Sequence, residues 1–264
     1  MPRVAPRHLE PPNGPTVTER RGLGNNAGVD FSPPSPPASL PAVSPALPRA
    51  LPPALPPALP PEGIERVRRL MAQRERTLLG LVGPPGAGKS TLAAALQHAL
   101  GHDAQVVPMD GFHLANVELQ RLDRAGRKGA PDTFDAAGYA ALLRRLRTQR
   151  ADETVYAPEF RREIEEPVAG AIAVLPQTRL VITEGNYLLL ADEPWAGVAA
   201  LLDEIWYVDV DDRLRTERLV RRHEQFGRSA QAAKDWVSGT DEPNAQLIKA
   251  TRSRAHWVFS WNQA

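Results

Sequence analysis

Leu78-Leu79-Gly80-Leu81-Val82-Gly83-Pro84-Pro85-Gly86-Ala87-Gly88-Lys89-Ser90-Thr91 is the stretch that decides the fold. Its second half fits G-x-x-x-x-G-K-[ST], a loop that cradles phosphate groups. Its first half is a short apolar run, which predicts a buried strand. Leucines at 92, 96 and 100 then predict a helix that Gly101 can close. Strand, loop and helix follow one another without a gap, which is the context that the motif requires.

The residue types of this loop suit a concentrated anion. Glycines let the backbone curl so that several N–H groups point inward, and the helix N-terminus adds partial positive charge. Lys89 can reach the β- and γ-phosphates, and the Ser90 hydroxyl can ligate Mg²⁺. We therefore predict binding of ATP with Mg²⁺ by Gly83, Gly86, Ala87, Gly88, Lys89, Ser90 and Thr91. The alternative is a Gly/Pro-rich turn before an ordinary helix.

Composition excludes several classes of protein. The chain has 264 residues, enough for one medium α/β domain and an appendage. Its net charge of +1 gives no global field that would favour nucleic acid or a membrane surface as a partner. It has no cysteine, so disulfides and thiolate chemistry are excluded. No apolar run approaches a membrane span. We expect a cytoplasmic protein.

The first part of the chain, residues 1–61, differs from the rest. It holds 18 of the 27 prolines, and Ala-Leu-Pro-Pro occurs three times between Ala50 and Pro61. Proline lacks an N–H and fixes φ, so this stretch suits neither a helix interior nor a sheet. We predict a disordered or polyproline II tail before a folded domain at 62–264. A tail that docks to a proline-recognising partner is the functional alternative.

Strands alternate with helical patterns along the rest of the chain. We predict helices at 61–76, 139–146 and 213–223, loops at 124–132 and 156–162, and strands at 105–108, 171–175, 180–183, 205–208 and 256–259. This alternation predicts an α/β fold with a doubly wound, mostly parallel sheet. The basic stretch that contains Gly227 is poor in apolar residues and predicts a small lid.

Two carboxylates follow predicted strands, where open α/β sheets bind ligands. Asp110 follows the strand at 105–108 and could accept a proton from an acceptor hydroxyl; otherwise it is a helix N-cap. His113, nearby, either contacts the substrate or orients the loop. Glu184 closes the strand at 180–183 and would face Mg²⁺. Beside Glu184 we assign Asn186 and Tyr187 to substrate binding.

Arginine is the third feature, because phosphoryl transfer spreads negative charge over the γ-oxygens. The candidate lid carries Arg218, Arg221, Arg222 and Arg228; the alternative for each is a solvated helix face. Arg161 and Arg162 in the predicted loop form a second set of anion contacts.

Five ordered stretches resemble the nucleoside and nucleotide kinase family of P-loop kinases, which is related to uridine kinase, phosphoribulokinase and bacterial pantothenate kinase. They are the P-loop, 108–114 (Pro-Met-Asp-Gly-Phe-His-Leu), 127–135 (Arg-Lys-Gly-Ala-Pro-Asp-Thr-Phe-Asp), 183–189 (Thr-Glu-Gly-Asn-Tyr-Leu-Leu) and 241–245 (Asp-Glu-Pro-Asn-Ala). The resemblance covers roughly 62–264 and implies the P-loop kinase fold with a small lid.

The resemblance also implies roles for single residues. Asp110 matches the family base, and Glu184 matches the acid near Mg²⁺. Arg218 and Arg222 fall where lid arginines are expected, and Asn244 would help to hold the adenine. Phe160-Arg161-Arg162 departs from the Phe-Asp-Arg of many relatives.

The leading hypothesis is an ATP-dependent kinase whose partner is a small-molecule hydroxyl acceptor: a nucleoside, a sugar or a pantothenate-like compound. Lys89, Asp110, Glu184, Arg218 and Arg222 form its catalytic set. A switch GTPase should carry Asn-Lys-x-Asp and a transporter ATPase Leu-Ser-Gly-Gly, and neither motif occurs. An inert kinase domain that acts through its Pro-rich tail is a further alternative. Whether the protein forms a homodimer is left open.

Overall fold

The structure is a computed structural model that describes residues 58–261. The predicted Pro-rich tail therefore lies outside the described residues, except for its last four, 58–61. Within 58–261, no helix is both long and apolar enough to cross a bilayer.

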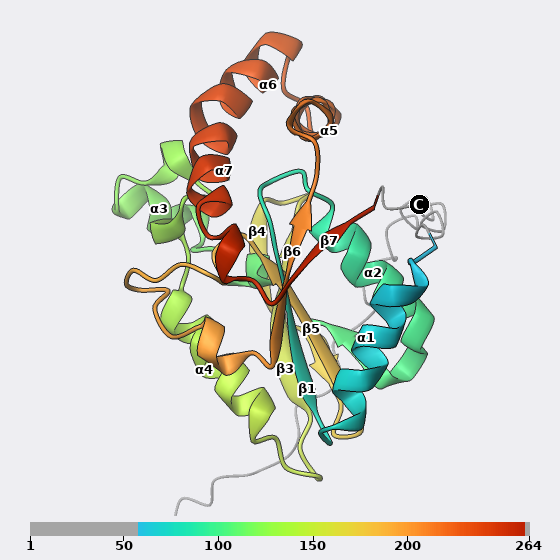
Figure 1. The fold of residues 1–264 in the computed structure, drawn as a ribbon. Helices are drawn as coiled ribbons and strands as arrows, with labels where there is room; N and C mark the ends of the chain where they lie inside the picture. The colour runs from blue at the N-terminus through green and yellow to red at the C-terminus, as the bar shows by residue number, and fades with distance from the viewer. Residues whose placement is uncertain (1–57, 262–264) are drawn as a thin grey trace, which may run out of the picture. The chain divides into compact units, whose positions relative to one another are not determined.

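A five-stranded sheet forms the centre of the fold (Figure 1). Every neighbouring pair is parallel, in the order β2-β5-β1-β6-β7. The strands are β1 (Thr77–Val82), β2 (Ala104–Val106), β5 (Leu180–Gly185), β6 (Glu204–Asp209) and β7 (Trp257–Ser260). Because all these pairs are parallel, the predicted parallel sheet is confirmed. The P-loop follows β1, the central strand.

Helices cover both faces of this sheet (Figure 1), with α1 (Pro61–Ala72) and α2 (Lys89–Leu100) on one face and α4 (Ala136–Arg147) on the other. Side chains of a strand alternate between its faces. Leu79 and Leu81 accordingly pack with the α1 and α2 side, and Leu78 and Val82 with the α4 side. Each fully buried leucine contributes about 1.5–3 kcal/mol. These two cores hold the P-loop strand rigid.

Helix α1 ends at Ala72, four residues before the predicted end at Arg76. The Arg76 side chain donates hydrogen bonds to the carbonyl oxygens of Leu175, Pro176 and Thr178. These bonds tie the segment before β1 to the chain that leads into β5, so the backbone leaves the helix early.

The prediction of a loop at 156–162 is wrong, because residues 156–161 belong to a strand. Strand β3 (Val155–Arg161) pairs antiparallel with β4 (Glu166–Val174) in a separate two-stranded ribbon. The register shifts between Ala157 and Glu159, so Pro158 sits at an irregularity where a missing N–H is tolerated. The strand predicted at 171–175 is the end of β4.

The remaining α-helices are α3 (Asn116–Arg121) and those of a helical lid beyond the sheet (Figure 1). The lid consists of α5 (Asp212–Gln225), α6 (Ala230–Trp236), a π-helical turn (Val237–Asp241) and α7 (Glu242–Lys249). The side chains of Asp211 and Ser229 cap α5 and α6, which explains why these helices begin where they do.

Candidate active site

The P-loop has the conformation that its glycines predict. Gly86 and Gly88 have φ angles of 81° and 91°, in the region that L-residues rarely adopt. A Cβ on Gly86 would lie 2.9 Å from the carbonyl oxygen of Arg215 and 2.9 Å from Leu219 Cγ. The loop is therefore pressed against α5, and only glycine fits at position 86.

Lys89 is buried at the junction of the P-loop and β5. Its ammonium donates to the carbonyl oxygen of Gly83 (2.9 Å), to that of Pro84 (3.3 Å) and to Asn186 Oδ1 (2.7 Å). Burial lowers the pKa of Lys89, and the charge of Glu184 opposes that shift. These contacts fix the position of the ammonium.

Ser90 and Glu184 bring two oxygen ligands together, since Ser90 Oγ donates to Glu184 Oε1 over 3.0 Å. Burial raises the pKa of Glu184, as does the charge of Asp110, whereas Lys89 opposes the shift. A hydroxyl and a carboxylate are the hard ligands that Mg²⁺ prefers, and Mg²⁺ usually takes only one or two carboxylates from a protein. Residues 58–261 contain no cluster of three or more His, Asp or Glu that could hold a metal. The pair therefore fits a magnesium ion that also binds phosphate and water.

Asp110 lies in a 3₁₀ turn (Met109–Phe112) that follows β2. This turn is clamped on the β3–β4 ribbon, because a Cβ on Gly111 would lie 2.3 Å from the Pro158 carbonyl oxygen. The ribbon supplies Arg162, whose Nη2 lies 3.4 Å from Asp110 Oδ2. Asp110 is thus held beside a cation.

His113 orients the same turn. Its Nδ1–H donates to the carbonyl oxygen of Asp110 over 2.8 Å, which fixes the tautomer and leaves Nε2 as an acceptor. The ring lies 4.0 Å from that of Phe134 and 4.7 Å from that of Phe160, between ring centroids. Burial lowers the pKa of His113, although the charge of Asp110 opposes it. A neutral imidazole fits this place.

The lid helix α5 contributes two arginines to the site, Arg218 and Arg222. Arg218 Nη1 lies 3.9 Å from the point that a Cβ would take on Gly88. Burial lowers the pKa of Arg222, and the nearby charge of Arg162 lowers it further. Arg221 instead pairs with Glu217 at the surface (3.6 Å), which distinguishes it from Arg222. Arg228 lies over the ring of Trp236, 3.9 Å from its centroid.

These groups surround one cavity of about 1130 Å³. Of the residues predicted from the sequence, it brings together Gly86, Gly88, Lys89, Ser90, Thr91, Asp110, His113, Arg162, Glu184, Asn186, Arg218, Arg222, Arg228 and Asn244. The volume exceeds that of most small-ligand pockets, so it suits two ligands rather than one.

Five residues predicted from the sequence lie outside the lining of this cavity: Gly83, Ala87, Tyr187, Arg161 and Arg221. Gly83 and Ala87 support the P-loop, Gly83 through its carbonyl oxygen and Ala87 as a buried side chain. Tyr187 is fully buried, packs edge-on against Phe134 and donates to the carbonyl oxygen of Gly129. It supports the basic loop, so the expected substrate contact is replaced by a packing role. Arg161 pairs with Glu159 on the exposed ribbon.

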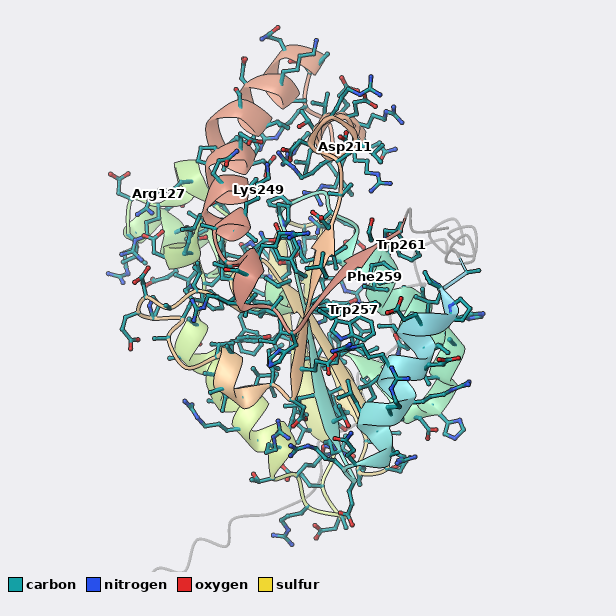
Figure 2. The ribbon with its side chains drawn as sticks, viewed as in Figure 1. Arg127, Asp211, Lys249, Trp257, Phe259 and Trp261 are labelled. Carbon is teal, nitrogen blue, oxygen red and sulfur yellow. The ribbon has the colours of Figure 1, made fainter. Side chains whose placement is uncertain are left out.

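Several lining residues were missed by sequence reasoning, among them Lys128, Phe160 and Trp261. Lys128 lies in the basic loop and over the ring of Phe160, 5.1 Å from its centroid. Trp261 stands beyond β7 in line with Trp257 and Phe259 (Figure 2). The alternation of aromatic residues from 257 to 261 was the signal that could have found it.

Comparison with known proteins gives consistent matches. Residues 78–263 match the model of the phosphoribulokinase / uridine kinase family. A candidate uridine kinase of Schizosaccharomyces pombe is 40% identical over 167 residues, which cover 60% of this chain and 71% of that protein. The Escherichia coli protein YggC, which is uncharacterized, is 33% identical over 195 residues, covering 72% of this chain and 80% of YggC.

Solved structures share the fold. A candidate fructose transport system kinase from Silicibacter sp. TM1040 superposes with a TM-score of 0.65 at 40% identity, over 74% of this chain and 95% of that one. YFH7 from Saccharomyces cerevisiae gives a TM-score of 0.65 at 19% identity, over 75% of this chain and 97% of that one, a likeness of fold alone.

Proposed function

Because this chain belongs to the phosphoribulokinase / uridine kinase family, we propose that it transfers the γ-phosphoryl group of ATP to a hydroxyl group of a small metabolite. Similar proteins carry names that refer to uridine, pantothenate and a fructose transport system. A nucleoside, a sugar and a pantothenate-like compound therefore all remain acceptors to test. The family also favours a kinase over a switch GTPase or a transporter ATPase.

One observation carries the proposal. Lys89, the Ser90–Glu184 pair and Asp110 line the same cavity, although they come from three different segments of the chain. A phosphate-binding cation, a metal-binding oxygen pair and a proton acceptor are the groups that phosphoryl transfer to an alcohol needs.

The triphosphate would lie on the P-loop. The N–H groups at the start of α2 point at its oxygens, and the helix dipole favours the negative charge. Lys89 would give up contacts with the carbonyl oxygens of Gly83 and Pro84 for contacts with the β- and γ-phosphates. Ser90 and Glu184 would hold the Mg²⁺ that neutralises charge on these phosphates.

Asp110 would orient the acceptor hydroxyl and take its proton as the oxygen attacks phosphorus. Arg162 lies only 3.4 Å from this carboxylate, on a ribbon that forms one wall of the cavity. Arg162 is the first residue of the turn that follows β3, from which it can contact an acceptor beside Asp110. Asp110 and Arg162 together thus define the acceptor end.

Arg222 and Arg162 would neutralise the charge that builds up on the transferring group. Burial is the main cause of the lowered pKa of Arg222, and the charge of Arg162 lowers that pKa further. Two like charges held this close favour an anion between them, which a γ-phosphoryl group supplies. Closure of the lid would exclude water and limit ATP hydrolysis.

A coupled ADP-release screen over nucleosides, sugars and pantothenate tests the proposal. We expect ADP release with one chemical class far above the rate with ATP alone, and a phosphorylated acceptor by mass spectrometry. The Lys89→Ala variant, assayed alongside, should remove this rate and so exclude a contaminating kinase. Hydrolysis of ATP at an equal rate with and without every acceptor would contradict transfer to an alcohol.

A further inference from the structure

Lys128 lines the cavity, yet the proposed function gives it no role. It lies in the basic loop at 124–132, and its ammonium donates to Asn116 Oδ1 over 2.6 Å and to the carbonyl oxygen of Glu165. The same ammonium lies over the ring of Phe160, 5.1 Å from its centroid. Groups from α3, from β3 and from the turn between β3 and β4 therefore hold this cation in one place.

Lys128 differs from the other basic residues of its loop in what it contacts. Arg124 and Arg127 both pair with the carboxylate of Asp132. Among the described residues, the hydrogen bonds of Lys128 go instead to an amide oxygen and a carbonyl oxygen, both uncharged. The cation of the loop that faces the cavity is thus the one that the described part of the chain does not neutralise.

Burial makes this arrangement unfavourable unless an anion arrives. It lowers the pKa of Lys128, and the nearby charges of Glu165 and Glu166 oppose that shift without cancelling it. Both carboxylate oxygens of Glu166 already accept from the backbone N–H of Asn116, at 3.0 and 3.1 Å. Glu165 is exposed to water, which screens its charge. A partly buried ammonium of this kind is stabilised by an anionic ligand.

The aromatic ring under Lys128 connects it to the acceptor end of the cavity. Phe160 lies 4.7 Å from the ring of His113, and His113 is bonded to the carbonyl oxygen of Asp110. Arg162, which lies 3.4 Å from the Asp110 carboxylate, is 5.9 Å from the centroid of the same Phe160 ring. An acceptor whose hydroxyl meets Asp110 would therefore extend along Phe160 toward Lys128.

We propose that the acceptor carries an oxyanion, either a carboxylate or a phosphate monoester, and that Lys128 binds this group. Hydrogen bonds between charged partners are about twice as strong as neutral ones, so the oxyanion would fix the acceptor in register with Asp110. The acceptor hydroxyl would attack the γ-phosphorus, the bond to the β,γ-bridging oxygen would break, and ADP would leave. The hydroxyl proton would pass to Asp110, and the oxyanion would be unchanged. The inference rests on the proposed function, because it names the class of acceptor for the same site.

Pairs of acceptors that differ in one anionic group test this inference on the full-length protein. Glycerol against glycerate and panthenol against pantothenate test a carboxylate, and fructose against fructose 6-phosphate tests a phosphate. From initial rates of ADP release, we expect kcat/KM for one anionic member to exceed that of its neutral partner by about 100-fold or more. The pair that responds identifies the oxyanion. Uridine, which is neutral, should be a poor acceptor.

Lys128→Gln removes the charge and keeps a polar side chain. We expect kcat/KM for the anionic acceptor to fall by about 10- to 100-fold, mainly through KM, and the KM for ATP to stay within about twofold. Lys128→Arg, which keeps the charge, should recover part of the loss. Arg127→Gln is the matched control, since Arg127 pairs with Asp132 outside the cavity lining, at the outer edge of the molecule in Figure 2.

The outcomes separate this inference from the proposed function. Equal kcat/KM for the neutral and anionic members of every pair would overturn the inference while the kinase proposal stands. So would an equal loss on both members in Lys128→Gln, because that loss would not depend on the charge of the ligand. Calorimetry that shows tighter binding of an anionic member, weakened in Lys128→Gln, without phosphorylation would support the oxyanion subsite and contradict the proposed transfer.

Discussion

The hydroxyl of Ser90 donates a 3.0 Å hydrogen bond to the buried carboxylate of Glu184. The two residues stand 94 positions apart in the chain and meet because β1 and β5 are parallel neighbours in the sheet. The strand before the P-loop and the strand before Glu184 thus end side by side. A metal site can be built there without any sequence motif that contains both ligands.

Glu184→Gln should therefore raise the Mg²⁺ concentration needed for half-maximal ATP turnover by about tenfold or more, because it removes a charge that the metal would face. Folding should be little affected, since burial already disfavours the ionised carboxylate, as its raised pKa indicates. A Mg²⁺ titration measures the effect. Glu204→Gln is the control, because Glu204 is a buried carboxylate outside the cavity lining. An unchanged requirement in Glu184→Gln would contradict the metal role.

Lys89→Ala should lower turnover by more than about 100-fold, because it removes the cation that contacts the transferring phosphates. The variant should also bind ATP more weakly. Steady-state kinetics and calorimetry measure both effects. Lys249→Ala serves as the control, since Lys249 pairs with Asp212 in the lid at 2.6 Å and lies outside the cavity lining. Turnover of Lys89→Ala near the wild-type rate would exclude the P-loop as the catalytic centre.

Asp110→Asn should leave ATP binding within about twofold and reduce transfer by about 10²- to 10⁴-fold, the range for loss of a general base. The amide keeps the shape of the carboxylate but cannot accept the proton. Single-turnover assays separate binding from transfer. Asp132→Asn is the control, because Asp132 pairs with Arg124 and Arg127 outside the cavity lining. Normal transfer by Asp110→Asn would refute the assignment.

Gly86→Ala should destabilise the fold by about 2 kcal/mol or more, because the residue has a φ of 81° and the new Cβ would meet Arg215 and Leu219 at 2.9 Å. Chemical denaturation measures the change. Gly126→Ala is the control, since a Cβ there has nothing within 4 Å. Equal stability of the two variants would show that α5 does not press on the P-loop.

His113 makes stability depend on pH. Burial depresses its pKa below the ordinary 6.5, so the unfolded chain binds a proton before the folded one does. The contribution of neutral His113 to the free energy of unfolding is therefore fully present above pH 6.5. It is lost as the pH falls through the lowered pKa of the folded state. The charges that face the ring are those of Asp110, Lys128 and Arg162.

Urea denaturation at about pH 7.5 and about pH 5.5 checks this sign. When the pH is lowered from the first value to the second, His113→Phe should lose less stability than the wild-type protein, because phenylalanine cannot be protonated. The same substitution at His98, which is exposed on α2, should leave the pH dependence unchanged. A steeper loss in His113→Phe would contradict the direction of the pKa shift.

The sequence predicted the sheet better than the ribbon, for a physical reason. Strands buried on both faces are continuous apolar runs, and those predicted at 78–82, 180–183 and 205–208 each fall inside an observed strand. Strand β3 instead contains Pro158 and is only partly buried, so its sequence resembles a loop. Only its antiparallel partner β4 makes it a strand.

The residues of the site likewise divide into those that the sequence could predict and those that it could not. Those carried by local motifs, such as Lys89 and Glu184, were predictable because the motif itself fixes their place. Trp261 was not, since its approach to Gly88 depends on β7 pairing beside β6, a long-range contact. Tyr187 shows the reverse error, because adjacency to Glu184 in sequence did not place it in the cavity.

The β3–β4 ribbon shares no hydrogen-bonded strand with the main sheet, yet it bears Phe160 and Arg162. Under the proposed function, substitutions at these two positions would therefore change how the acceptor is recognised without changing the strand pairing of the sheet that carries the P-loop and Glu184. An exchange of this ribbon between homologues should, on the proposed function, exchange their acceptor preferences only if the Asp110 turn that packs on the ribbon is exchanged with it.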